Sequence, residues 1–299
     1  MVCFRSLFLT GLFICGLGCA VAAGVDGAWE PTTWQGEKAF VSSSHGWKAI
    51  VSLERGRLMH FGPAEGDTNL LFAPAARNGS SSWGGHRVWL GPQSTWSGGW
   101  PPPAAWESSG AESVAIREGM LRLSMADPGD GWPRLTRTYS WEGAKLRCGV
   151  ELSGGKRPAQ IIQIIQVPEK AVVEASPTAV PEAPQGYVLL PAGGVPRLTA
   201  EFTAPPHVAR DERGLTLRHV RSVRKLGFRP QPLAAKSGAL AFRVSRGVQT
   251  GAVVSEPDGG FLTQVYLGGD EPFIELEQLS PLYANGPGVS FEIVIEGLK

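Results

Sequence analysis

The chain has 299 residues, 42% of them hydrophobic, and its formal net charge at pH 7 is +1. That length is enough for one large domain or two small ones with a substantial core. A charge so close to zero, with lysines and arginines scattered along the chain, gives no electrostatic case for nucleic acid or for an acidic partner.

The first 23 residues have the pattern of a secretory signal peptide. Arg5 precedes an apolar run over residues 7–23, and the run ends in small residues that suit cleavage near Ala22 or Ala23. The run is about the minimum length for a spanning helix, and no later segment continues a membrane pattern. We therefore predict export, giving a secreted or periplasmic mature chain with no transmembrane domain.

Cys19 offers an alternative to free release. Residues 16–19 partly resemble the lipobox of bacterial lipoproteins, in which Cys19 would carry a lipid anchor, although Gly16 stands where that pattern prefers an aliphatic residue. Cleavage of the leader leaves Cys148 as the one cysteine, which excludes a disulfide framework and a cysteine metal site. No His-x-His or His-Glu-x-x-His spacing occurs either, so we expect no metal and no cofactor.

Residues 24–44 are interpreted as an N-terminal extension, and residues 45–299 as a single domain built of strands. Most apolar or alternating segments are of strand length and are bounded by Gly, Pro, Asn or Asp, for example residues 47–53, 120–125, 134–141, 145–152, 160–167 and 289–295. No segment combines a sustained helical period with caps at both ends. Residues 173–185 carry three prolines and are interpreted as a loop inside the domain. The sequence therefore predicts an all-β fold, a large antiparallel sandwich or barrel.

The most informative segment covers residues 83–93, which we interpret as a glycine-led loop. In it, Trp83 and Trp89 flank His86 and Arg87. Tryptophan faces stack on pyranose rings, arginine donates a fixed fork of hydrogen bonds, and histidine exchanges a proton near neutral pH. The combination is typical of a sugar site. The alternatives are that the histidine closes the loop through a backbone hydrogen bond and that the arginine pairs with a strand glutamate.

More tryptophans follow in a proline-rich stretch. Trp96 and Trp100 precede the prolines of residues 101–103, which cannot lie in a central strand. Exposed aromatic residues often mark ligand or partner sites. We assign Trp83 or Trp89 to core packing, and Trp96 or Trp100 to a ligand platform.

Two carboxylates lie in an apolar strand near the C-terminus. Glu275 and Glu277 are two residues apart, so their side chains project to the same face of the strand. Mutual repulsion raises one pKa of such a pair, which suits an acid or a base. The alternative is an exposed strand face.

Both segments carry a family resemblance. Residues 83–89 resemble the Gly-Gly-His-Arg-hydrophobic-Trp motif of the DUF4380 family, which is assigned to the galactose mutarotase-like fold. Residues 273–282 are similar to that family's Leu-Glu-Leu-Glu-Thr-Leu-Gly-Pro-Leu segment, which in turn resembles the segment holding the general base of aldose 1-epimerases. The resemblance spans most of residues 45–296. It implies a galactose mutarotase-like antiparallel β-supersandwich, with the base at Glu277 and Glu275 beside it.

An aldose 1-epimerase removes a proton from the anomeric hydroxyl and donates one to the ring oxygen. The resemblance gives Glu277 the first role, and we expect His86 to take the second while Arg87 holds hydroxyls. Two departures weaken this expectation. Gln163, with a second glutamine three residues later, stands in the region where the epimerases carry a second histidine, and Gln93 stands where the DUF4380 pattern continues with glutamate. Glutamine binds a sugar but cannot act as an acid.

A non-catalytic carbohydrate-binding protein and an envelope interaction domain therefore remain alternatives. A mono- or oligosaccharide is the expected partner of the enzyme and of the carbohydrate-binding protein. An enzyme needs His86 and Glu277 to converge in one pocket, whereas a sugar-binding module needs only a tryptophan platform. A protein-binding domain needs a broad, flat aromatic patch.

Overall fold

The computed structural model describes residues 26–75, 83–96, 102–190, 207–222 and 225–298. The expected leader over residues 1–23 and Trp100 lie outside the described residues.

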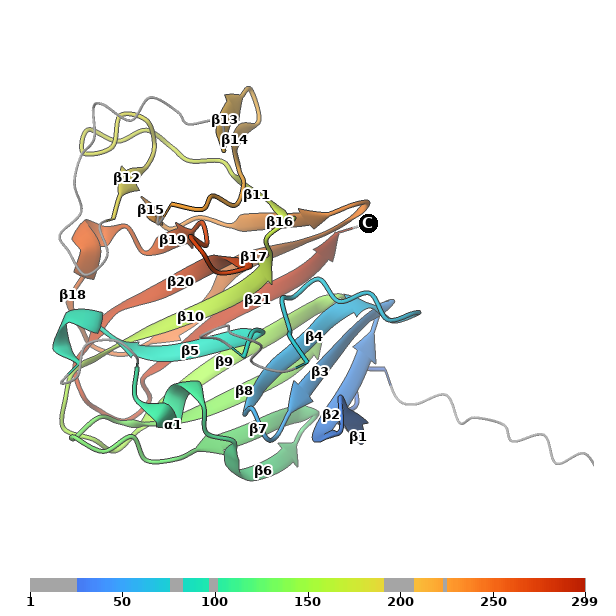
Figure 1. The fold of residues 1–299 in the computed structure, drawn as a ribbon. Coiled ribbons are helices and arrows are strands. Elements are labelled where there is room, and N and C mark those ends of the chain that lie inside the picture. Colours follow the sequence, from blue (N-terminus) through green and yellow to red (C-terminus); the bar gives the residue numbers. More distant parts are fainter. Residues whose placement is uncertain (1–25, 76–82, 97–101, 191–206, 223–224, 299) are drawn as a thin grey trace, which may run out of the picture.

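The described chain is almost entirely β-structure, arranged in three antiparallel sheets (Figure 1). The four-stranded sheet has the order β1-β2-β3-β4, with bounds β1 Glu30–Trp34, β2 Glu37–Ser44, β3 Trp47–Ser52 and β4 Arg57–Pro63. The seven-stranded sheet has the order β12-β15-β19-β20-β10-β5, with β18 also paired to β20; its bounds are β5 His86–Gly91, β10 Ala159–Pro168, β12 Val188–Leu189, β15 Lys225–Phe228, β18 Val253–Ser255, β19 Thr263–Tyr266 and β20 Phe273–Tyr283.

The ten-stranded sheet has the order β13-β14-β11-β16-β17-β21-β9-β8-β7-β6. Its bounds are β6 Ala111–Arg117, β7 Met120–Met125, β8 Arg134–Glu142, β9 Lys145–Ser153, β11 Val172–Ala175, β13 Val208–Asp211, β14 Gly214–Leu217, β16 Leu233–Ser237, β17 Leu240–Thr250 and β21 Ser290–Leu298. The helical elements within the described residues are short: α1 (Ala104–Glu107) and the 3₁₀ turns η1 (Gln93–Thr95) and η2 (Pro257–Gly260). None of them is long and apolar enough to cross a membrane.

The expected all-β antiparallel sandwich is confirmed. In Figure 1 the seven-stranded sheet lies over the ten-stranded sheet, and the four-stranded sheet lies to one side. The layers are joined by close contacts: Gln163 Nε2 donates across the sandwich to the carbonyl of Phe291 on β21, at 2.8 Å. Trp47 of β3 stacks on Phe61 with a ring separation of 5.3 Å and also packs against Gly297 on β21.

Alternation of apolar and polar residues determines the strands of the ten-stranded sheet. Along β7 and β9, buried and partly exposed residues alternate, so one face enters the core and the other meets solvent. In the seven-stranded sheet, by contrast, the central strands β10 and β20 are buried at nearly every position, because both of their faces are covered. Tight turns join neighbouring strands. Glu118 and Gly119 both have positive φ between β6 and β7, as the preferred two-residue hairpin requires.

Three expected boundaries differ in the structure. Residues 30–44 form β1 and β2, which pair through β3 with the rest of the four-stranded sheet, so the expected boundary at residue 45 falls inside a sheet. Residues 83–93 are not a loop throughout, because His86–Gly91 form β5 and pair with β10. The proline-bearing segment 173–185 begins with β11 residues and then leads to β12, connecting two sheets of the sandwich.

Gly85, just before β5, gives a test of the local fold. It has φ +72°, and a Cβ there would lie 2.2 Å from the carbonyl oxygen of Leu58. Gly119 also has positive φ, but a Cβ there would meet nothing within 4 Å. Both alanine substitutions carry the cost of a left-handed conformation. Gly85→Ala must also displace backbone, so we expect it to lower the free energy of unfolding by about 1–3 kcal/mol more than Gly119→Ala. Urea denaturation of both variants measures this difference, and equal losses would contradict it.

Candidate functional site

A group of polar side chains of the seven-stranded sheet lies on the face turned away from the ten-stranded sheet. Residues directly opposite each other in antiparallel strands project to the same face. One row joins Arg87 of β5 through β10 to Glu277 of β20, and the next joins Gln166 of β10 to Glu275 of β20. The two rows continue across β19 and β15, and the polar face consists of Arg87, Gln166, Lys225, Gln264, Tyr266, Glu275 and Glu277.

Each carboxylate of the expected pair has its own cation. Glu277 Oε2 lies 2.8 Å from Lys225 Nζ. Glu275 Oε1 accepts hydrogen bonds from Arg87 Nη1 at 2.6 Å and from Gln166 Nε2 at 2.9 Å. The prediction that the two glutamates share one face is therefore correct. The alternative of an exposed strand face is wrong, because both side chains are buried.

Burial raises the pKa of Glu275, and the neighbouring charge of Glu277 raises it further. Arg87, Lys225 and the amide of Gln166 act in the opposite direction without cancelling the increase. The surroundings of Glu275 thus favour its protonated form.

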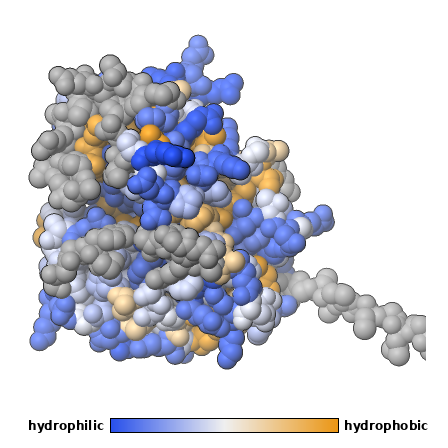
Figure 2. Space-filling view, in the orientation of Figure 1, coloured by the Kyte–Doolittle hydropathy of each residue, from blue (hydrophilic) through white to orange (hydrophobic). Residues whose placement is uncertain are grey.

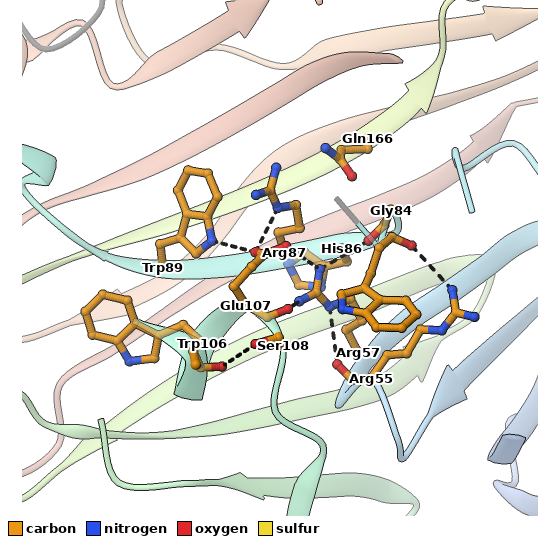
Figure 3. Close-up of polar contacts among 12 residues, drawn as sticks. Arg55, Arg57, Gly84, His86, Arg87, Trp89, Trp106, Glu107, Ser108 and Gln166 are labelled. Carbon is orange, nitrogen blue, oxygen red and sulfur yellow. Dashed lines mark hydrogen bonds and ion pairs between the residues drawn. The ribbon is translucent and has the colours of Figure 1, made fainter. Parts of the chain in front are cut away.

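Glu107 is a third carboxylate at this site, and no sequence motif indicated it. It ends helix α1 and reaches the edge of β5 (Figure 3). Its Oε2 accepts from Arg87 Nε at 3.0 Å and from Trp89 Nε1 at 2.9 Å. Burial tends to raise its pKa, but the charges of Arg57 and Arg87 outweigh burial and lower it. Glu107 therefore stays ionised beside the arginines.

Two more arginines complete this buried charge cluster. Arg57 of β4 donates to the carbonyls of Gly84 and Glu107, and burial, opposed by Glu107, lowers its pKa to about 10. Arg137 of β8 donates to the carbonyl of Trp106 at 3.0 Å. Strand β5 is an edge strand of its sheet. The arginines and α1 cover that edge, which would otherwise leave backbone groups open to another strand.

The structure does not bring His86 and Glu277 together. Adjacent residues of a strand point to opposite faces, so His86 projects into the sandwich while Arg87 projects to the polar face. His86 Nε2 lies 2.9 Å from Gln163 Oε1, and its ring packs edge-on against Tyr139 of the other sheet. The expectation that His86 acts as the acid opposite Glu277 is therefore wrong. Gln163 also lies on this inner face and does not reach the polar face.

The buried imidazole of His86 predicts a pH dependence of stability. Burial lowers the pKa of His86 to about 3, and the positive charge of Arg137 adds to the effect. Burial and the positive charge of Lys48 lower the pKa of His60 to about 4. Both are neutral in the folded chain but gain a proton in the unfolded chain below about pH 6.5, so stability falls as pH drops. Each contributes a slope of about 1.4 kcal/mol per pH unit. We expect His86→Gln to flatten the slope between about pH 6 and 4.5 by that amount, measured by urea denaturation; an unchanged slope would overturn this assignment.

The tryptophans are mainly structural. Trp96, expected in a ligand platform, is 8% exposed; its indole donates to the carbonyl of Leu90 and its ring packs on Trp89 and Trp106. Trp89 is 3% exposed, in agreement with its alternative assignment to the core. Trp83 is partly buried, and its ring centre lies 4.7 Å from the guanidinium carbon of Arg55. Gln93 begins η1, after the end of β5, and is partly exposed.

Several solved structures share the fold of this chain. A protein from Escherichia coli K12 that is provisionally named an aldose 1-epimerase superposes with a TM-score of 0.58 at 13% identity, over 87% of this chain and 98% of that chain. A galactose mutarotase-like protein from Clostridium acetobutylicum gives 0.55 at 8% identity, over 90% and 97% of the two chains. A galactose 1-epimerase from Lactobacillus acidophilus gives 0.51 at 11% identity, over 90% and 98%.

The fold is that of the galactose mutarotase-like β-sandwich proteins. No protein-family model matches the chain, so the resemblance to DUF4380 stays a prediction. No curated protein matches it either. At such low identity, the similarity between structures establishes the fold alone.

Within this mutarotase-like fold, the site residues that the sequence did not reveal come from outside the two motifs. Glu107 follows a tryptophan in a four-residue helix, and Lys225 is the last residue of a short basic stretch over residues 218–225. Neither position has a local signal, because each meets its partner across a long sequence separation. Among the described residues, no group of three or more His, Cys, Asp or Glu side chains could hold a metal ion.

The described surface also bears on protein binding. On the face seen in Figure 2, apolar residues form small patches among hydrophilic ones. The described large apolar side chains that are exposed lie on β6, β17 and β18: Val114, Ile116, Val248, Val253 and Val254. None of them is aromatic, so these residues do not provide the aromatic patch expected of an envelope interaction domain.

Proposed function

We propose that the chain is an exported carbohydrate-interacting protein that catalyses an aldose 1-epimerase-like reaction on its polar face. The observation that carries the proposal is the pair Glu275 and Glu277, which share one face of a central strand and contact different cations. Amides, carboxylates, an ammonium and a phenol on this face match the alternating donors and acceptors of sugar hydroxyls. The leader-like residues 1–23 support export.

In the proposed reaction, Glu277 accepts the proton of the anomeric hydroxyl while Glu275 donates a proton to the ring oxygen. The bond between the anomeric carbon and the ring oxygen breaks, giving the open-chain aldehyde. After rotation about the adjacent bond, closure reverses both transfers and restores each carboxyl group. Glu275 replaces His86 as the proton donor because it lies on the same face as the base, and because its raised pKa favours the protonated form.

A binding protein without turnover is the second candidate. It is favoured by the position of His86 inside the sandwich, which leaves the polar face without a histidine acid.

Proton NMR of the wild-type chain with a panel of aldoses separates the two. The interconversion of the anomers is followed after dissolving a pure anomer, and shifts of protein resonances are followed as the sugar is added. Acceleration of interconversion supports the enzyme. Saturable shifts without acceleration support the binding protein, and neither effect with any aldose would contradict both.

A further inference from the structure

Glu107 has no role in the proposed proton transfers, yet it contacts the site from outside the sheet. Its Oε2 holds both Arg87 Nε and the indole of Trp89, two side chains on the same face of β5. Arg57 of β4 holds the helix end from the other side, with Nη1 at 3.7 Å from Glu107 Oε1 and Nη2 bonded to the Glu107 carbonyl. The carboxylate is thus fixed between two sheets (Figure 3).

Arg87 is correspondingly fixed on three sides. Its Nε bonds to Glu107, its Nη1 bonds to Glu275 at 2.6 Å, and its guanidinium carbon lies 4.2 Å from the ring centre of Trp89. Its side chain is 2% exposed. A buried guanidinium in this position forms charge-assisted hydrogen bonds with a carboxylate on α1 and with a carboxylate on β20.

We infer that Glu107 is a positioning residue, which fixes Arg87 between α1 and Glu275. Its negative charge partly offsets the positive charge of Arg87 at Glu275. The inference rests on the proposed function, in which Glu275 must hold a proton to donate it. Without Glu107, Arg87 would hold Glu275 more firmly in its ionised form.

The other charged and polar groups around the two carboxylates do not replace this effect. Those facing Glu275 are Arg87 from β5, Gln166 from β10, Lys225 from β15, Tyr266 from β19 and Glu277 from β20 itself. Those around Glu107 are Arg57 from β4, Arg87 and Trp89 from β5, and Arg137 from β8. Arg87 is the residue that contacts both carboxylates, so the coupling between them passes through it.

The test is a carboxyl ¹³C NMR titration of Glu275 in the wild-type chain and in Glu107→Gln, without sugar. The resonance is assigned from its loss in Glu275→Gln. The Glu107→Gln change removes the negative charge that offsets Arg87, so Arg87 stabilises the ionised form of Glu275 more strongly. The midpoint of the Glu275 titration should therefore move to lower pH by about one unit. In the mutarotation assay, the loss of rate with rising pH should begin at correspondingly lower pH.

Trp89→Phe is the matched control, because it removes the other donor to Glu107 Oε2 and leaves the carboxylate charge in place. Its Glu275 titration should stay near that of the wild type, even where its melting temperature falls. A Glu107→Gln chain that loses stability but keeps the wild-type Glu275 titration would reduce Glu107 to a structural role and overturn the inference. Where Glu107→Gln does not fold, Glu107→Asp, whose shorter carboxylate retreats from Arg87, should give a smaller shift in the same direction, and no shift would again overturn it. Because the titration needs no sugar, it reports on Glu107 even where mutarotation fails.

Discussion

Glu277→Gln is expected to slow mutarotation by about 100- to 10,000-fold, the usual contribution of a general base. Glutamine has nearly the same shape as glutamate, and its amide oxygen still accepts from Lys225 Nζ, which lies 2.8 Å from the carboxylate. What disappears is the ability to accept a proton from the anomeric hydroxyl. The loss should therefore fall on kcat, with KM changed far less.

The anomer-interconversion assay by NMR measures this effect at saturating sugar. Glu296→Gln is a suitable control, because Glu296 lies on β21 in a partly exposed pair with Arg243 and away from the polar face. Its rate should equal that of the wild type. If Glu277→Gln keeps the wild-type rate in a chain that accelerates mutarotation, the base is another group and the proposed mechanism fails.

Arg87→Met is expected to lower the free energy of unfolding near neutral pH by about 3–5 kcal/mol. Methionine keeps much of the apolar length of the side chain, but it takes the guanidinium away from buried Glu275 and from buried Glu107, which is ionised. An uncompensated buried charge is far more costly than a lost surface pair. Urea denaturation measures the difference.

The pH dependence of this loss has a definite sign. Arg87 favours the ionised form of both carboxyl groups, so its removal raises the folded-state pKa of each. A carboxyl group whose folded pKa lies above its unfolded value of about 4.3 is destabilising when ionised, and the penalty is relieved as pH falls. The difference between Arg87→Met and the wild type should therefore be largest at neutral pH and shrink under acid conditions.

Arg147→Met is the matched control. Arg147 also contacts two glutamates, Glu142 and Glu292, but its side chain is 32% exposed. Water replaces such a partner, so the control should lose less than about 1 kcal/mol. Similar losses in the two variants would show that burial of the Arg87 cluster does not determine its contribution.

The class of fold and the shared face of the carboxylate pair could be predicted from the sequence, because both follow from a period of two along a strand. Alternating burial along β7 and β9 matches the expected strands, and Glu275 and Glu277 share a face wherever that strand lies. The same rule separates His86 from Arg87, but it applies only once β5 is recognised as a strand. Gly84 and Gly85, just before the strand, and the tryptophans on either side of His86 and Arg87 favoured a loop.

The groups that meet on the polar face are brought together by long-range pairing between strands. Glu107 and Glu275 are far from Arg87 along the chain, and Lys225 is far from Glu277, so no local pattern relates them. Strand order placed β5, β10 and β20 side by side, and α1 folded over the free edge of β5. Periodicity fixes the direction of a side chain relative to its own strand, whereas long-range pairing fixes its neighbours. For this reason the sequence could predict that Glu275 and Glu277 share a face but could not predict the cation that each contacts or the helix that contacts Arg87.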